Sequence, residues 1–213
     1  MHSTTLNAPA PGLSASNAKV LVGVYVATTV LSAFLLFLIQ PIMARLTLPL
    51  LGGSSSVWAL TMSFFQIALL VGYGYAHVVN KMLSPKMGII IHAALLALVF
   101  LLLNFDVKSA AAAAPSFGGE NLKLLLILAT TIGLPFAVMS ANAPMLQNWF
   151  SRSGHRDASE PYFLYAASNF GSITSLLLYP TVVEPLVGIQ SQTAGWSAGY
   201  GLLAVGIMLC GFL

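Results

Sequence analysis

The sequence predicts an all-α, polytopic helical membrane protein of about six transmembrane helices, and three observations predict it. Of its 213 residues 58% are hydrophobic and only 6% are charged. The mean hydropathy is +0.89. Soluble domains carry about 25% charged residues. A surface with so little charge cannot be well solvated, so lipid must face most of the chain.

The apolar runs are spaced as membrane spans, near residues 20–40, 57–79, 87–105, 122–141, 161–183 and 195–213. A spanning helix needs about 20 residues to cross about 30 Å of hydrocarbon. These runs are too long for barrel strands and lack the alternation that lipid-facing strands show. We therefore expect one transmembrane helical domain over 19–213, preceded by a disordered cytoplasmic tail over 1–18.

The two ends of the chain carry further expectations. The tail "MHSTTLNAPAPGLSASNAK" is rich in Ser, Ala and Pro, which is typical of disorder. A signal peptide is the alternative, but the apolar stretch from Val20 to Ile39 is too long for its hydrophobic region and lacks a cleavage site. The last run, "GLLAVGIMLCGFL", has no polar flank, which predicts a fragment of a longer protein. A short protein with an unanchored last helix is the alternative.

Basic residues near the span ends predict the topology. One face of the membrane would collect Lys19, Lys81, Lys86, Arg152 and Arg156, and the other Arg45, Lys108 and Lys123. Cytoplasmic loops carry an excess of Lys and Arg, so the first face is predicted to be cytoplasmic. We expect a multi-pass protein of the bacterial inner (cytoplasmic) membrane with a cytoplasmic N-terminus. The net charge of +3 reports this topology and predicts no nucleic-acid partner; the lipid bilayer is the expected one.

The first span ends in the stretch "IQPIMARLTLPLLGGSSS". Pro41 is predicted to end the helix, Arg45 to hold the interface, and Gly52 and Gly53 to turn the chain. One of the three serines that follow would cap the second span. Gln40 and Arg45 are candidates for contact with a polar ligand or a partner domain. The alternative is that Gln40 bonds to another helix and that Arg45 reaches the headgroups.

Small residues four apart predict two close helix contacts. One stripe lies in the second span and the other in the fifth: Ala68, Gly72 and Ala76, and Ala167, Gly171 and Ser175. Such stripes let helix backbones approach where lipid offers no hydrophobic drive. A second stripe of the second span, Gln66, Tyr73 and His77, is predicted to face protein or water.

The fourth span carries Pro135, which we expect to bend it. Asn142 and Pro144 then predict the cap and first turn of a new short helix that lies at the membrane interface. The stretch 104–123 before this span is predicted to be a connector without chemistry.

The remaining polar residues are candidates for a cavity or for interhelical hydrogen bonds. Glu184 ends the fifth span, where it is either an ion-coupling carboxylate or a water-exposed acid. His92 lies deep in its span and is bonded to another helix or faces a cavity. The full candidate set is Gln40, Arg45, Gln66, His77, Asn142, Gln147, Asn169 and Glu184. Polar packing between helices is the competing role for Asn142, Gln147, Asn148 and Asn169.

Catalytic and cofactor motifs are absent from the sequence. It contains no G-x-G-x-x-G, Walker A, H-E-x-x-H or G-x-S-x-G pattern, and five acidic residues in all. Cys210 is the single cysteine, so no disulfide framework or cysteine metal site is predicted. We expect no catalytic residue, metal site or cofactor in this chain.

Three ordered stretches, 34–77, 140–172 and 179–200, resemble the membrane region of the bacterial fused spermidine-synthase-like proteins. They include "FLLFLIQPIMARLTLPLLGGSSSVWALTMSFFQIALLVGYGYAH", "SANAPMLQNWFSRSGHRDASEPYFLYAASNFGS" and "YPTVVEPLVGIQSQTAGWSAGY". In that family a multi-span region, sometimes likened to the major facilitator superfamily, precedes a soluble domain similar to spermidine synthase. The resemblance covers roughly residues 20–213.

The resemblance implies a cytoplasmic Rossmann-like domain after the last span of complete members. This sequence stops before the residues that would bind decarboxylated S-adenosylmethionine and a polyamine, so no catalytic residue is carried over. Alone it should not transfer aminopropyl groups, whereas the complete protein would be aminopropyltransferase-like. The alternative function is half of a small-molecule or cation transporter, in which Gln66, His77, Asn142, Asn169 and Glu184 line a cavity, since broken helices often mark binding sites. A third possibility is a scaffold that only assembles helices.

Overall fold

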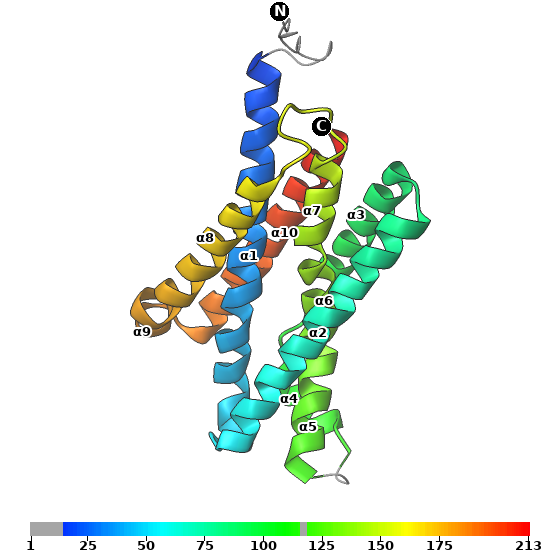
Figure 1. Cartoon of the computed structure of the whole chain (residues 1–213). Helices are drawn as coiled ribbons and strands as arrows, with labels where there is room; N and C mark the ends of the chain where they lie inside the picture. Colours follow the sequence, from blue (N-terminus) through cyan, green and yellow to red (C-terminus); the bar gives the residue numbers. More distant parts are fainter. Residues whose placement is uncertain (1–14, 116–118) are drawn as a thin grey trace, which may run out of the picture.

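The computed structural model describes residues 15–115 and 119–213, and this part of the chain is helical and contains no strand. The prediction of an all-α polytopic protein is confirmed. The predicted tail lies mostly outside the described residues, and the first helix already begins at Ala15. The helices stand side by side as one bundle (Figure 1).

The helices follow in chain order as α1 (Ala15–Leu51), α2 (Ser55–Met82), α3 (Pro85–Leu102), α4 (Val107–Ala113), α5 (Gly119–Leu128), η1 (Ala129–Gly133), α6 (Leu134–Ser140), α7 (Asn142–Phe150), α8 (Tyr162–Leu178), η2 (Tyr179–Val183), α9 (Glu184–Leu186) and α10 (Ile189–Phe212). The elements η1 and η2 are single π-helical turns.

Five helical runs are long and apolar enough to cross a membrane. They are Ala18–Leu51, Ser55–Met82, Pro85–Leu102, Gly119–Phe150 and Ile189–Phe212. The predicted fifth span corresponds to the run from α8 through η2 to α9, which the π-helical turn interrupts. The arrangement is that of a multi-pass membrane protein.

The first span does not end at Pro41, and that prediction is wrong. Helix α1 continues through Pro41 and Pro49 to Leu51. A proline removes one backbone hydrogen bond, whereas leaving the helix would strand several polar groups in an apolar setting. The predicted turn follows later: Gly52 has φ +75°, and the Ser54 hydroxyl accepts from the amide of Val57 to cap α2.

The fourth span also differs from the prediction. A π-helical turn precedes Pro135, and a single turn residue, Ala141, separates α6 from α7. Helix α7 does not lie at the interface, because Met145, Leu146 and Phe150 are fully buried and α7 continues the line of α6 (Figure 1). Asn142 caps nothing with its side chain, which instead bonds to other helices.

Two predicted connectors are partly helical. Within 104–123, the Asp106 carboxylate accepts from the amide of Ser109 and caps α4. This bond and that of the Ser109 hydroxyl hold the pKa of Asp106 below its ordinary value. Helix α10 starts before the predicted 195, because the buried amide of Gln192 donates to the carbonyls that end the previous run.

Helix α1 is the centre of the bundle and packs most extensively on α8 and α10, whereas α2 packs on α6. Both small stripes are buried, as predicted. Gly171 lies against the carbonyl of Val30 in α1, and Gly72 against the carbonyl of Ala137 in α6. On α10, the indole of Trp196 donates to the carbonyl of Leu35 over 2.9 Å.

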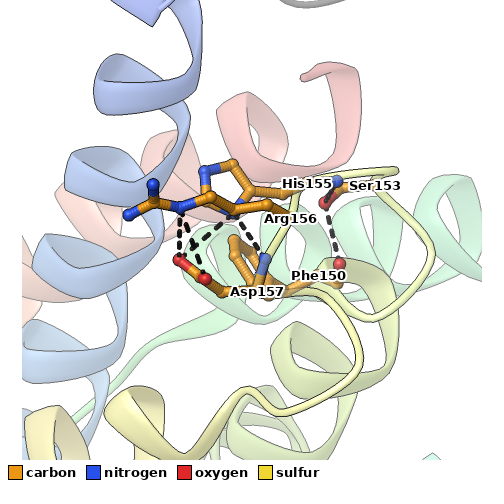
Figure 2. A network of polar contacts seen from close by, with 5 residues as sticks. All are labelled: Phe150, Ser153, His155, Arg156 and Asp157. Carbon is orange, nitrogen blue, oxygen red and sulfur yellow. Dashed lines mark hydrogen bonds and ion pairs between the residues drawn. The ribbon is translucent and has the colours of Figure 1, made fainter. Parts of the chain in front are cut away.

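Both described chain ends lie at one end of the bundle, together with the turn from α2 to α3 and the loop from α7 to α8 (Figure 1). That loop is closed by its own contacts (Figure 2). The Ser153 hydroxyl donates to the carbonyl of Phe150 over 2.8 Å, and His155 Nδ1 accepts from the amide of Asp157 over 3.2 Å. Arg156 lies 3.5 Å from the carboxylate of Asp157 and stays exposed.

Candidate functional site

A hydrogen-bonded series of buried polar side chains crosses the bundle from α3 to α1. The Nε2 atom of His92 in α3 lies 2.7 Å from the Oδ1 atom of Asn142 at the start of α7. The Nδ2 atom of Asn142 donates to the hydroxyl of Ser32 in α1 over 3.0 Å. His92 and Asn142 are fully buried, and Ser32 is 5% exposed. Three spans are joined by one polar connection.

The geometry defines which atoms donate and which accept in this hydrogen-bonded series. An amide oxygen only accepts, so the Nε2 atom of His92 carries the proton that bonds to Asn142. The Nδ1 atom of His92 is buried without a partner among the described residues. The imidazole contacts the rings of Tyr75 and Trp149, with centroids 5.8 Å and 6.1 Å away. The aromatic surroundings hold the imidazole away from bulk water.

A cavity of about 190 Å³ lies at the α1 end of this hydrogen-bonded series. It lies between the middle turns of α1, α2 and α8 and the junction of α6 with α7. Its polar lining comes from Thr29, Ser32, Tyr73, Ser140, Ser168, Asn169 and Ser172, and its apolar lining from Ala33, Leu36, Phe37, Leu69, Met139 and Ala143. Ser32 belongs both to the hydrogen-bonded series and to the cavity lining, so the two form one site.

The floor and mouth of the cavity differ in exposure. Thr29 is 2% exposed, and its hydroxyl has no partner among the described residues. Tyr73 and Asn169 are exposed, so they stand at the mouth. A buried hydroxyl without a partner is costly, and one that lines a cavity can bond to whatever fills it.

A second polar cluster joins α1 to the end of the fifth span. The guanidinium of Arg45 donates to the main-chain carbonyl of Glu184 over 3.1 Å. The Tyr179 hydroxyl donates to the carbonyl of Pro41 over 3.4 Å. Among the described residues, the Arg45 guanidinium makes no ion pair with the carboxylate of Glu184, which is exposed. The contact is therefore one of a side chain with backbone.

The predicted site residues fall into separate places. Asn142 and Asn169 belong to the site formed by the hydrogen-bonded series and the cavity. Arg45 and Glu184 meet near the C-terminal end of α1. Gln66 and His77 lie exposed on α2 outside the cavity lining, and Gln147 is half-buried on α7. Gln40 donates to the carbonyl of Leu36 in its own helix over 3.5 Å, not to another helix.

Sequence reasoning missed the hydroxyl side chains of the site. Thr29 and Ser32 interrupt an apolar run as "TTVLS", and Ser168 and Ser172 are four apart in the fifth span. Hydroxyls at helical spacing in a span are the available signal, because residues three and four apart share a helix face. For His92 the sequence allows a bond to another helix or a place at a cavity, and its bond to Asn142 supports the first.

The site is suited to binding by hydrogen bonds. Among the described residues, no group of three or more His, Cys, Asp or Glu side chains is placed to hold a metal ion. None of the described residues that line the cavity carries a charge. The lining offers hydroxyl and amide groups on one side and aliphatic and aromatic carbon on the other.

Comparison with models of known protein families, with curated proteins and with solved structures finds no match to this chain.

Proposed function

We propose that this chain is the membrane module of a polyamine-aminopropyltransferase-like protein, which anchors or serves a cytoplasmic catalytic domain. The observation that carries the proposal is that the three stretches of the resemblance form one contact unit. Arg45 and Pro41 from the first bond to Glu184 and Tyr179 from the third. Gly72, also from the first, packs on Ser140 from the second.

The charge distribution supports the orientation that such a module needs. The end of α10 lies at the same end of the bundle as the α2–α3 turn and the α7–α8 loop (Figure 1). In the sequence, Lys81 and Lys86 flank that turn and Arg152 belongs to that loop. By the excess of basic residues this end faces the cytoplasm, so a domain joined after α10 would lie inside the cell. In the proposal, the membrane is the bacterial inner membrane.

The test is an aminopropyltransferase assay on the complete gene product, with and without residues 1–213. The proposal expects activity in both proteins, with the longer one in the membrane fraction and the shorter one in the soluble fraction. A longer gene product that lacks an aminopropyltransferase-like domain, or that transfers no aminopropyl group in either form, would reject the proposal.

Half of a small-molecule transporter is the second candidate, and the cavity beside Asn169 favours it. Broken helices often mark binding sites in transporters, and two π-helical turns interrupt the spans here. Asn169→Ala should then reduce uptake into cells that express the protein, whereas Gln66→Ala, outside the cavity lining, should not. Equal uptake in all variants would argue against transport.

A further inference from the structure

The cavity that Ser32 links to His92 carries hydroxyl groups that an occupant can bond to. Its floor carries the Thr29 hydroxyl, which is almost fully buried and has no partner among the described residues. Ser32 accepts from Asn142, so its own proton remains free to be donated. The floor therefore offers two hydroxyl groups to an occupant.

The volume limits the size of that occupant. The cavity of about 190 Å³ is smaller than the roughly 300–1,000 Å³ of pockets for drug-sized ligands. Since a water molecule occupies about 30 Å³ of liquid, the space corresponds to about six waters. A compact molecule of a few carbon atoms fits this volume.

The lining determines the charge of the occupant. None of the described lining residues is an Asp, Glu, His, Lys or Arg, so the lining supplies no charged group. A cation or anion placed there would lose its hydration without a counter-charge, at a cost of many kcal/mol. An uncharged molecule loses only hydrogen bonds to water, which the hydroxyls and the Asn169 amide can replace.

The position of the cavity mouth also favours an uncharged occupant. Leu70 on α2 and Ile173 on α8 flank the lining residues Tyr73 and Ser172 along their helices, and both are more than half exposed. Leu70 lies in a helical run that is long and apolar enough to cross a membrane, and Ile173 lies in the 17-residue helix α8, so we expect hydrocarbon to surround the mouth. An uncharged amphipathic molecule can enter from hydrocarbon, whereas an ion is strongly opposed there.

We propose that the cavity between α1, α2, α8 and the α6–α7 junction binds a compact, uncharged, hydroxylated molecule. Its hydroxyl groups bond to Thr29 and Ser32 on the floor and to Asn169 at the mouth, and its carbon skeleton packs on Phe37 and Met139. This site is a property of the bundle and is independent of any attached catalytic domain.

The test uses single cysteines in the Cys210→Ala background, with the protein in phospholipid nanodiscs. Ser172→Cys reports on the cavity, and Ile173→Cys is the matched control on the exposed face of the same helix. The labelling reagent is methyl methanethiosulfonate, which is small and uncharged. Two probes of equal carbon skeleton compete at equal millimolar concentration: 1,6-hexanediol and 1,6-diaminohexane, a dication.

The proposal expects hexanediol to slow labelling of the residue-172 cysteine at least threefold, and diaminohexane to leave it unchanged. Neither probe should slow labelling at 173. Adding Thr29→Val, which keeps the volume and removes the hydroxyl, should abolish the protection while the variant elutes as a single species. Protection by the diamine, equal protection at 173, or no protection by the diol would overturn the proposal. Loss of aminopropyltransferase activity in the complete protein would not bear on these outcomes.

Discussion

Gly72 of α2 packs closely against α6, and this contact allows a sharp prediction. A Cβ atom at this position would overlap the Ser140 hydroxyl oxygen and the main-chain carbonyl oxygen of Ala137. The side chain of Ser140 can rotate, but the carbonyl belongs to the α6 backbone. Gly72→Ala must therefore push the two helices apart.

The magnitude follows from the contacts that the shift disturbs. Overpacking in a close-packed interior costs about 1–3 kcal/mol. The Ser140 hydroxyl also donates to the carbonyl of Ala137 over 2.8 Å, and a hydrogen bond of this kind contributes about 0.5–1.5 kcal/mol. We expect Gly72→Ala to lower the free energy of unfolding by about 2–4 kcal/mol.

Gly74, two residues further along α2, is the matched control. A Cβ atom there would meet no atom within 4 Å. Gly74→Ala should be neutral or stabilise the protein by up to about 1 kcal/mol, because Ala is the better helix former. The assay is equilibrium unfolding by SDS in mixed micelles, followed by far-UV circular dichroism. A difference of about 3 kcal/mol is roughly a hundredfold in the folding equilibrium. Equal unfolding curves for the two variants would show that α2 and α6 do not approach closely at Gly72.

Three further predictions concern hydrogen bonds. Asn142→Ala should lower the free energy of unfolding by about 2–4 kcal/mol, because two buried bonds are lost and the imidazole donor of α3 is left unpaired; the same assay on the half-buried Asn148→Ala should show less than about 1 kcal/mol. Trp196→Phe removes the indole donor to an α1 carbonyl and should cost about 1 kcal/mol, and an unchanged denaturation midpoint would contradict it. The folded-state pKa of Asp106 lies below its ordinary value, so its contribution to the stability of α4 is fully present above the ordinary pKa and is lost as pH falls through the folded pKa. Amide hydrogen exchange in α4 should then accelerate at low pH, and Asp106→Ala should remove this pH dependence.

The sequence was sufficient for the fold class and for the helix contacts, for physical reasons. Long uncharged runs have one stable solution in lipid, so the helices and their approximate limits could be predicted. The stripe through Gly72 and that through Gly171 could be predicted because small residues at four-residue spacing mark close packing. A turn at Gly52 and Gly53 and a serine cap could be predicted from local backbone chemistry, but only the structure shows that Ser54 is the serine that caps α2.

Pro41 and Asn142 show where sequence reasoning failed. The predicted roles, a helix end at Pro41 and a helix cap at Asn142, are those that these residues have in water. In an apolar bundle the backbone remains helical around Pro41, and the Asn142 amide finds buried partners on two other helices. The site formed by the hydrogen-bonded series and the cavity unites residues that are distant in sequence, such as Ser32 and Asn142, and only the packing of the helices brings them together.

The account depends most on helices that pack as described while lipid covers their outer face, and α8 offers the most direct measurement. A nitroxide spin label is placed at successive positions from 163 to 178 except 171, where a side chain would meet the Val30 carbonyl. Its collision rates with oxygen and with a water-soluble nickel chelate are compared for the protein in nanodiscs. Oxygen maxima are expected at the exposed positions Ile173 and Leu177 and minima at the buried positions Leu164 and Ser175, with little access for nickel. High nickel access along the whole helix, or oxygen maxima at 164 and 175, would contradict this packing.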